Sequence, residues 1–341
     1  MHKTNIPPCK IIRNIDINWK LFKKILSYRT YTRDKEAQKE FSDYLCSYIS
    51  TLGDVNIEED KTGNLYITKG KADLYTCVVS HQDINQDVID SVSIVQTSKL
   101  ITGIDNSTGL QCGIGADDKC GVYFALHCLK TMDSVKCLFT VDEEVGAVGA
   151  YEADISFMED VNFIIQLDRN SWDNDISSET NGEVVVSQDF MSASSGVLNK
   201  YNYDYTVCMF TDVGVLAPAS NLCGVNISCG YFDEHTGIER ISIPHFINAI
   251  AFAEELIEVM AEQKWENNYD FPRENPEEYY HYCSGWDFKR EDESYVQDCL
   301  HIGECPLCAC NDLKTLKDDV IVCNNCDSYY NIPEEKHIGI W

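Results

Sequence analysis

Residues 136–150 read KCLFTVDEEVGAVGA, an apolar run that passes directly into two adjacent glutamates. The run from Lys136 to Val141 is short and continuous, as expected of a strand buried inside a sheet. Glu143 and Glu144 therefore follow the end of a predicted buried strand. Their place is informative, because open α/β sheets bind ligands beyond the carboxyl ends of their strands.

Two other apolar runs end in the same manner. The run LYTCVVS at residues 74–80 is followed by His81 and Asp83, and VNFIIQL at residues 161–167 is followed by Asp168. Three predicted strands thus carry histidine or carboxylate side chains at their carboxyl ends. We expect these side chains to meet at one edge of the sheet.

Two more residues of metal-ligand type lie at the ends of predicted elements. Asp117 belongs to GIGADDKCG at residues 113–121, a glycine-rich stretch that leads into a helix predicted over residues 118–131. His235 belongs to GYFDEHTG at residues 230–237, which follows the apolar run CGVNISCGY. Both are expected near the same edge.

The remaining periodicity predicts the fold class. Apolar residues at helical spacing indicate a helix over 35–52, alternation indicates a hairpin of 55–58 with 64–68, and Pro244 suits the first turn of a long helix. Strands alternate with helices, which is typical of an α/β fold with a mostly parallel mixed sheet sandwiched by helices. The glycine-containing segment 97–113 is expected to be a loop that forms one wall of a cleft.

The set of ligand types satisfies the requirements of a two-metal hydrolytic site. Such a site needs a bridging carboxylate and at least two further ligands for each ion. We expect Asp117 to bridge, and the other ligands are expected to be His81 with Asp168 on one ion and Glu144 with His235 on the other. Zinc accepts both imidazole nitrogen and carboxylate oxygen, and cobalt or manganese would also fit. Glu143 would then be free to act as the general base, and Asp83 would hold the second ring nitrogen of His81.

Each of these residues also has an ordinary structural explanation when it is considered alone. A histidine at a strand end can be a core residue with its hydrogen bonds satisfied, a pair of glutamates can be a solvated turn, and Asp117 or Asp118 can cap a helix. Five suitable residues at five element ends, in this order, are a much less common accident. The joint pattern therefore favours a metal centre.

The segments SHQD, GADDKCG, DEEVGAVGA, QLD and GYFDEHTG resemble the co-catalytic zinc exopeptidase superfamily, which includes peptidase T-like tripeptidases and zinc aminopeptidases. The resemblance covers residues 35–262, and the DEEVGAVGA and ADDKCG segments are its most specific parts. It implies the ligand roles given above, with Glu143 as acid and base and Asp83 as the partner of His81. It also implies a substrate, namely short peptides.

One departure from the tripeptidase pattern concerns the segment 169–234 between Asp168 and His235. This segment is too short for the large lid or dimerisation domain of that branch, so we expect a catalytic domain without a large lid. Asp212 matches a family loop and is expected either to recognise a free amino group or to be a surface-loop residue. Arg240 is expected either to bind a carboxylate or to be solvated.

Composition argues against several other classes of protein. Hydrophobic residues make up 44% of the chain, which argues against disorder, and no apolar stretch is long enough for a transmembrane helix. The formal net charge of −29 disfavours nucleic acid as a partner and is expected to serve solubility. The N-terminus lacks the apolar core of a signal peptide, so a cytoplasmic protein is expected. Most of the 17 cysteines lie singly in apolar runs and are predicted to be small buried hydrophobic residues, as at Cys77, Cys128, Cys137, Cys208 and Cys229.

The C-terminal cysteines have a different spacing. Cys305 and Cys308 form one CxxC pair and Cys323 and Cys326 form a second, which predicts a structural zinc ion held by four thiolates in a small ribbon. We therefore predict an N-terminal extension over 1–34, a catalytic domain over 35–262, an extended connector over 263–300 and a zinc ribbon over 301–341.

The predicted activity is that of a metal-dependent exopeptidase, an aminopeptidase or tripeptidase in which two zinc ions hold the attacking water and Glu143 is the general base. A deacylase or carboxypeptidase on the same scaffold is the alternative within enzymes. A catalytically silent zinc-binding scaffold protein is the alternative outside them, although no ligand is missing. The sequence is compatible with a homo-oligomer.

Overall fold

The computed structural model of the protein describes residues 6–86, 88–89, 91–180, 183–208, 210–267, 313–315, 320–323 and 329–331. The chain divides into two compact units, residues 1–271 and residues 272–341. The predicted metal centre lies in the first unit.

Four parallel strands form the middle of the first unit. Their order across the sheet is β7 (Val135–Thr140), β3 (Tyr75–His81), β8 (Val161–Arg169) and β12 (Gly224–Ser228). The continuous apolar runs predicted as buried strands correspond to β3, β7 and β8, and every residue of β3 and β7 is buried. The sheet extends to nine strands through β1 (Val55–Glu59), β2 (Leu65–Lys69), β9 (Asp175–Thr180), β10 (Glu183–Val184) and β11 (Asp204–Cys208).

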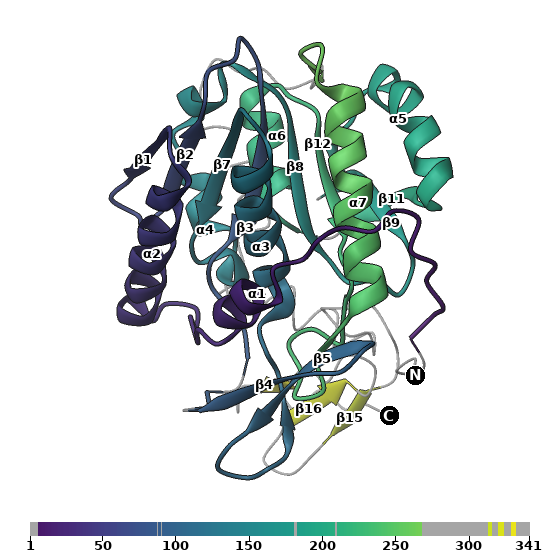
Figure 1. Cartoon of the computed structure of the whole chain (residues 1–341). Coiled ribbons are helices and arrows are strands. Elements are labelled where there is room, and N and C mark those ends of the chain that lie inside the picture. The colour runs from purple at the N-terminus through teal and green to yellow at the C-terminus, as the bar shows by residue number, and fades with distance from the viewer. Residues whose placement is uncertain are drawn as a thin grey trace. The chain divides into compact units, whose positions relative to one another are not determined.

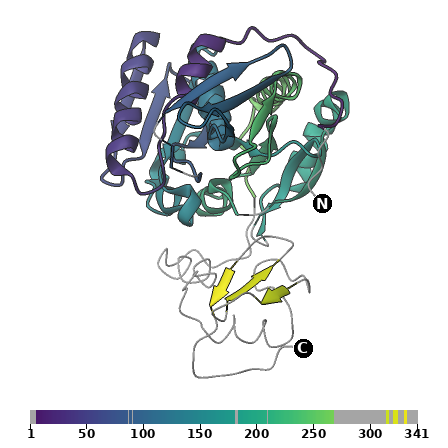
Figure 2. The same cartoon turned by 90° about the horizontal axis from the view of Figure 1, so that it is seen from below.

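Helices cover both faces of this sheet, as Figure 1 and Figure 2 show. One face packs against α1 (Trp19–Leu26), α2 (Lys35–Ile49), α3 (Ala116–Thr131), α5 (Gln188–Tyr201) and α7 (Ile243–Met260). The other face packs against α4 (Val148–Tyr151) and α6 (Asp212–Ser220). Along β3, Val78 contributes to the first core while Cys77 and Val79 contribute to the second, because successive side chains of a strand alternate between faces. The predicted α/β sandwich with a mostly parallel sheet is therefore confirmed.

The helix predicted over 35–52 and the hairpin predicted after it both form. The Asp34 carboxylate accepts a hydrogen bond from the Ala37 N–H and so caps α2. In the turn between β1 and β2, one oxygen of Asp60 accepts hydrogen bonds from three successive backbone N–H groups, those of residues 62–64. The predicted helix continues past Ile49 as a 3₁₀ turn, η1 (Ser50–Leu52), before Gly53 ends it.

The expectation of a loop over residues 97–113 is wrong. This segment contains β5 (Leu100–Asp105) and β6 (Gln111–Cys112), which belong to a second sheet of five strands. Its other members are β4 (Val92–Gln96), β13 (Tyr231–Phe232) and β14 (Arg240–Ser242). The strands were missed because they are short, contain Gly103, and pair partly with β14, which lies far away in the sequence.

The residues before α2 are part of the core of this unit. Phe22 of α1 is fully buried, and its ring stacks on Phe246 of α7 with centroids 4.6 Å apart and lies 4.9 Å from Tyr123 of α3. After α7, Trp265 packs on Phe190 and donates a hydrogen bond from Nε1 to the Met260 carbonyl oxygen. Of the connector expected over 263–300, only residues 263–267 are described.

The expectation of buried single cysteines is confirmed in the described part of the chain. Cys77, Cys128, Cys137, Cys208 and Cys229 are buried and carry free thiols. Across the ranges that the structure describes, no helix combines the length and the apolar character needed to cross a bilayer.

The second unit contains a three-stranded antiparallel sheet. Its strands are β15 (Leu313–Thr315), β16 (Val320–Cys323) and β17 (Tyr329–Asn331), with β16 in the middle. Cys323 is the last residue of β16, whereas Cys305, Cys308 and Cys326 lie outside the described residues. The zinc ion expected on these four cysteines stays a prediction.

Candidate metal centre

The carboxyl ends of three adjacent strands bring together the residues singled out from the sequence. His81 is the last residue of β3, Asp168 lies near the end of β8, and the turn η2 (Glu143–Val145) follows β7. Because β3 lies between β7 and β8 and all three run parallel, these side chains converge at one sheet edge. The turn between β13 and β14 supplies His235, and the start of α3 supplies Asp117.

Asp117 lies between the two histidines. Its Oδ1 is 3.0 Å from His81 Nε2, and its Oδ2 is 3.3 Å from His235 Nε2. Each histidine has a second carboxylate nearby, because His81 Nε2 is 3.6 Å from Asp168 Oδ1 and His235 Nε2 is 3.0 Å from Glu144. The structure thus brings together the two histidine–carboxylate pairs named from the sequence, with Asp117 between them. Their roles as metal ligands stay a prediction.

The backbone at the start of α3 is irregular around Asp117. Gly115 has φ +64°, in the left-handed region that favours glycine, and a Cβ there would lie 2.5 Å from Ile84. Asp117 and Asp118 have non-helical backbone angles, and the peptide bond between them is cis. Asp118 turns inward, where its carboxylate accepts hydrogen bonds from the N–H groups of Gly121 and His81. Asp118 is thus the residue of this pair that caps the helix.

Glu239 holds the same loop from the opposite side, and sequence reasoning missed it. Its fully buried carboxylate accepts hydrogen bonds from four successive backbone N–H groups, those of residues 114–117, at 2.7–3.4 Å. Gln86 donates a further hydrogen bond to Glu239 Oε2. Glu239 follows His235 by only four residues, so the DEHTGIER segment contributes both a candidate ligand and a support for Asp117.

Glu143 lies beside the two histidine–carboxylate pairs and does not itself pair closely with either histidine. Its Oε2 is 3.9 Å from His81 Nε2, and its side chain is 11% exposed. The backbone N–H of Glu143 donates to Asp83 Oδ1 at 3.0 Å, and the N–H of Glu144 donates to Asp83 Oδ2 at 3.4 Å. Asp83 therefore positions the two glutamates as well as lying close to His81.

The expected contact between Asp83 and the His81 ring takes a modified form. His81 Nδ1 is 3.0 Å from the backbone carbonyl oxygen of Asp83 and 3.5 Å from its carboxylate. A carbonyl oxygen is an acceptor, so it favours a proton on Nδ1 and leaves Nε2 as the ring nitrogen that faces Asp117. The Asp83 carboxylate accepts its hydrogen bonds mainly from the backbone N–H groups of Glu143 and Glu144 and from the Thr32 hydroxyl.

Asp168 is oriented by several polar neighbours. Gln166 Nε2 and the Thr211 hydroxyl donate to Asp168 Oδ2, at 3.1 and 3.3 Å, and the Tyr231 hydroxyl lies 3.3 Å from Oδ1. The Asn226 side chain exchanges two hydrogen bonds with the Asp168 backbone. These contacts fix the direction of the carboxylate before any ligand is bound.

The electrostatics of the cluster favour a cation. Burial, with the nearby negative charges of Asp117 and others, raises the pKa of Asp168 well above its usual range, and burial raises the pKa of Glu143 and Glu144. Burial would lower the pKa of His81, but hydrogen bonds to Asp117 and Asp168 outweigh it and raise that pKa. Within the described ranges, no lysine or arginine forms an ion pair with Asp117, Glu143, Glu144 or Asp168.

The donors around His81 and Asp117 form a candidate metal site. Two groups of three side chains, His81 with Asp117 and Glu144 and His81 with Asp118 and Asp168, each bring their ligand atoms within 4.8 Å of one another. His235 adds a second imidazole, whose Nε2 lies 3.3 Å from Asp117 Oδ2. Imidazole and carboxylate are suitable donors for zinc, cobalt and manganese. Buried carboxylates that lack cationic side chains commonly receive their compensating charge from a metal.

Asp212 and Arg240 were also singled out from the sequence, and neither is a solvated surface residue. Asp212 is fully buried at the start of α6, where its Oδ2 accepts a hydrogen bond from Thr140 at 2.6 Å. It is therefore no surface-loop residue. Its other oxygen, Oδ1, is buried without a hydrogen-bond partner among the described residues, and recognition of a free amino group stays a prediction. Arg240 forms an ion pair with Asp233 in the turn that carries His235, so it stabilises that turn.

Lys119 is a second residue whose role the sequence did not reveal. It is fully buried, donates hydrogen bonds to the Thr30 hydroxyl and the Gln82 carbonyl oxygen, and lies 3.9 Å above the ring of Phe41. Gln82 follows His81 directly, so Lys119 ties the chain at His81 to the segment before α2. Its contacts are too distant in sequence for the ADDKCG motif to predict them.

Comparison with solved structures shows which fold this is. Aminopeptidase PepT from Bacillus cereus superposes with a TM-score of 0.56 at 14% identity, over 72% of this chain and 98% of that one. A tripeptidase from Staphylococcus aureus gives 0.57 at 13% identity, over 72% and 98%. An aminopeptidase from Desulfurococcus kamchatkensis gives 0.55 at 13% identity, over 72% and 95%.

No protein-family model and no curated protein sequence matches this chain. The structural matches nevertheless show that it has the zinc exopeptidase fold, as the sequence motifs led us to expect. The chain thus combines the fold of metal-dependent aminopeptidases and tripeptidases with a candidate His/Asp/Glu metal site.

Proposed function

We propose that this protein is a metallo-exopeptidase that removes residues from short peptides, with an aminopeptidase or tripeptidase activity. The position of Asp117 carries the proposal, since its two carboxylate oxygens face two histidines that each have a second carboxylate nearby. Such an arrangement suits a pair of divalent ions bridged by one carboxylate. His81 and Asp168 would hold one ion, and Glu144 and His235 the other.

Bound zinc would supply Lewis acidity at the scissile carbonyl and would lower the pKa of a water molecule. The protein supplies the base. Glu143 is buried next to the proposed ligands and is not needed as one, so its carboxylate can take a proton from the water and pass it to the leaving amine. Asp83 and its hydrogen bonds to the glutamate turn keep Glu143 and Glu144 in these separate roles.

The test separates metal binding from catalysis. Glu143→Ala is expected to retain the two zinc ions of the centre and to lose turnover by at least about a hundredfold, the usual contribution of a general base. Asp117→Ala is expected to lose both metal and turnover, and metal content would be measured by elemental analysis of the purified chain. Substantial turnover by Glu143→Ala would contradict the role of this residue.

The same experiments distinguish the rival functions. About three zinc ions per chain would fit two in this centre and one on the C-terminal cysteines, whereas one ion would favour a silent scaffold protein. Amino-acid p-nitroanilides compared with N-acyl amino acids as substrates separate an aminopeptidase from a deacylase or carboxypeptidase. The oligomeric state stays a prediction.

A further inference from the structure

Asp142 directly precedes Glu143, the residue proposed as the general base, in the connection from β7 to η2. Its backbone has φ +53° and ψ +40°, a left-handed conformation that is unfavourable for a residue with a side chain. Such a conformation persists only where the surrounding structure holds the residue in place. The side chain of Asp142 is only 9% exposed, so its contacts show what holds it.

The carboxylate of Asp142 binds the start of α2 and the residues just before it. Oδ1 accepts hydrogen bonds from the Arg33 backbone N–H at 3.0 Å and from Gln38 Nε2 at 2.8 Å. Oδ2 forms an ion pair with Lys35 Nζ at 2.5 Å. Hydrogen bonds to a charged group are the stronger kind, and three donors on two oxygens fix the direction of the carboxylate. The residue before Glu143 is therefore tied to the N-terminal end of α2.

The same segment also binds Asp83. The Thr32 hydroxyl donates a hydrogen bond to Asp83 Oδ2 at 3.0 Å. Asp83 in turn accepts hydrogen bonds from the first two backbone N–H groups of η2. The turn η2 is thus held through two carboxylates, those of Asp83 and Asp142, and both of them contact residues 32–38.

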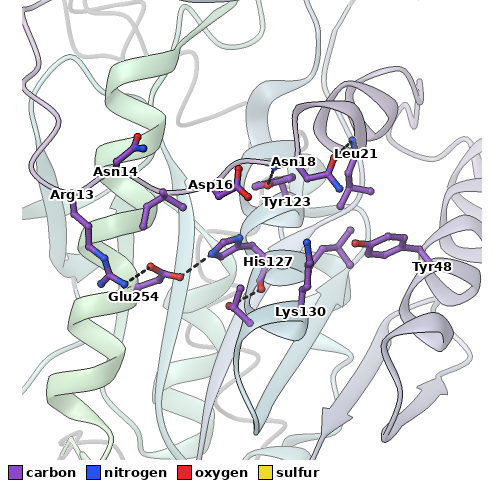
Figure 3. Close-up of a pocket in the computed structure, with 13 residues that line it drawn as sticks. Arg13, Asn14, Asp16, Asn18, Leu21, Tyr48, Tyr123, His127, Lys130 and Glu254 are labelled. Carbon is purple, nitrogen blue, oxygen red and sulfur yellow. Dashed lines mark hydrogen bonds and ion pairs between the residues drawn. The ribbon is translucent and has the colours of Figure 1, made fainter.

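The chain that precedes this segment is anchored to the core. Figure 3 shows its first part, residues 13–18, beside a cavity that α3 and α7 also line. There the Asn18 backbone N–H donates a hydrogen bond to the Tyr123 hydroxyl at 2.7 Å. The helix α1, which follows, is buried in the core that covers one face of the sheet. The segment that contacts Asp142 is therefore fixed relative to the sheet.

We propose that Asp142 is a positioning residue, which holds the Glu143 carboxylate in the direction needed for proton transfer. The inference rests on the proposed function, because that function makes Glu143 the base. Both carboxylate oxygens of Asp142 are occupied by donors of the α2 segment, so Asp142 acts through the backbone. Its left-handed conformation directs the chain from β7 into η2, where the Glu143 carbonyl oxygen accepts hydrogen bonds from the N–H groups of Gly146 and Ala147. A catalytic group displaced by about 1 Å can lose about a hundredfold in rate.

The test measures turnover and backbone exchange in the full chain. Asp142→Gly removes all three side-chain contacts, whereas glycine adopts the left-handed conformation without a steric penalty. With zinc in excess, we expect kcat for leucine p-nitroanilide to fall at least about tenfold and KM to stay within about twofold. In the chelated protein, the amide hydrogens of Glu143 and Glu144 should exchange for deuterium at least about tenfold faster, because η2 opens more easily.

Further variants test the contacts separately. Asp142→Asn keeps an acceptor oxygen for Arg33 and Gln38 and tolerates the left-handed conformation, so it should restore kcat to within about threefold of the wild type. Lys35→Met combined with Gln38→Leu removes two of the three donors and leaves the connection from β7 to η2 unchanged. This double variant should reproduce the loss of kcat and decides the test where Asp142→Gly does not fold. The control Asp54→Gly, at an exposed bend, should keep kcat and exchange within about twofold.

The outcomes separate this inference from the proposed function. Wild-type kcat and wild-type exchange in Asp142→Gly would overturn the inference. Loss of zinc in parallel with loss of turnover would also overturn it, because Asp142 would then support the metal and not the base. A wild-type chain without peptidase turnover would instead refute the proposed function, and the exchange rates would still decide whether Asp142 holds η2.

Discussion

Replacing Glu239 by glutamine preserves the shape of the side chain but turns one carboxylate oxygen into a hydrogen-bond donor. In the native protein both oxygens accept, Oε2 from the N–H groups of Ile114 and Gly115 and Oε1 from those of residues 116 and 117. In either orientation the amide of Glu239→Gln faces two of these N–H groups with an NH₂ group. A buried donor that loses its acceptor costs about 1–3 kcal/mol, so the free energy of unfolding should fall by about 2–6 kcal/mol.

The same substitution should weaken metal binding. The four N–H groups belong to the loop that ends in Asp117, and loss of a group that orients a ligand typically costs about 10–100-fold in metal affinity. Unfolding in urea, followed by circular dichroism on the chelated protein, measures the first effect. Competition for zinc against a chromophoric chelator measures the second, and this readout would not respond to a purely structural role distant from the ligands.

The matched control is Glu40→Gln, the same chemical change at an exposed position of α2, which should alter stability by less than about 0.5 kcal/mol. If Glu239→Gln matched this control in both assays, the loop would hold its conformation without the carboxylate. The account of how Asp117 is positioned would then be refuted.

Three further predictions concern the chain around this site. Phe22→Ala should lower the free energy of unfolding, measured in urea, by about 3–5 kcal/mol, because it removes a fully buried ring stacked on Phe246. The control Ile12→Ala, at a 40% exposed position, should lower it by less than about 1 kcal/mol. Equal effects would show that α1 is not part of the core. Burial lowers the pKa of His245 to about 4. Below about pH 6.5 the unfolded chain therefore takes up a proton at this residue while the folded chain does not. The folded state loses stability for this reason as the pH falls from about 6.5 to about 4. By pH 5 this loss should reach about 2 kcal/mol relative to pH 7, and His245→Phe should remove that part of the pH dependence; an unchanged dependence would show that His245 titrates normally. Removal of metal by a chelator should lower the melting temperature, because ions that bind only the folded state stabilise it, and added zinc should restore it. Asp117→Asn should lose most of this chelator effect, whereas an undiminished effect would place the stabilising metal elsewhere.

Much of the candidate site could be predicted because its residues stand at the ends of elements with strong local patterns. The buried runs of β3, β7 and β8 are readable from adjacent residues, and His81, Glu144 and Asp168 follow from their positions at the ends of these runs. The bridging role of Asp117 was assigned by counting the ligands that two ions need. The structure places Asp117 between the two histidines, and the role itself stays a prediction. The choice between Glu143 and Glu144 relied on the family resemblance as well, since neighbouring glutamates in a turn have the same local pattern.

The supports of the site required the tertiary structure. Glu239 binds backbone N–H groups more than a hundred residues earlier in the chain, and such a contact leaves no trace in the types of the residues that donate. The same applies to Lys119, whose partners include Thr30, and to β5, which pairs with the distant β14. The sequence alone determined that β3, β7 and β8 are buried strands and which chemical types follow their ends, because periodicity and side-chain chemistry are local properties. The tertiary structure decided which carboxylate faces a histidine and which holds the backbone, because that choice depends on groups brought together only when the chain folds.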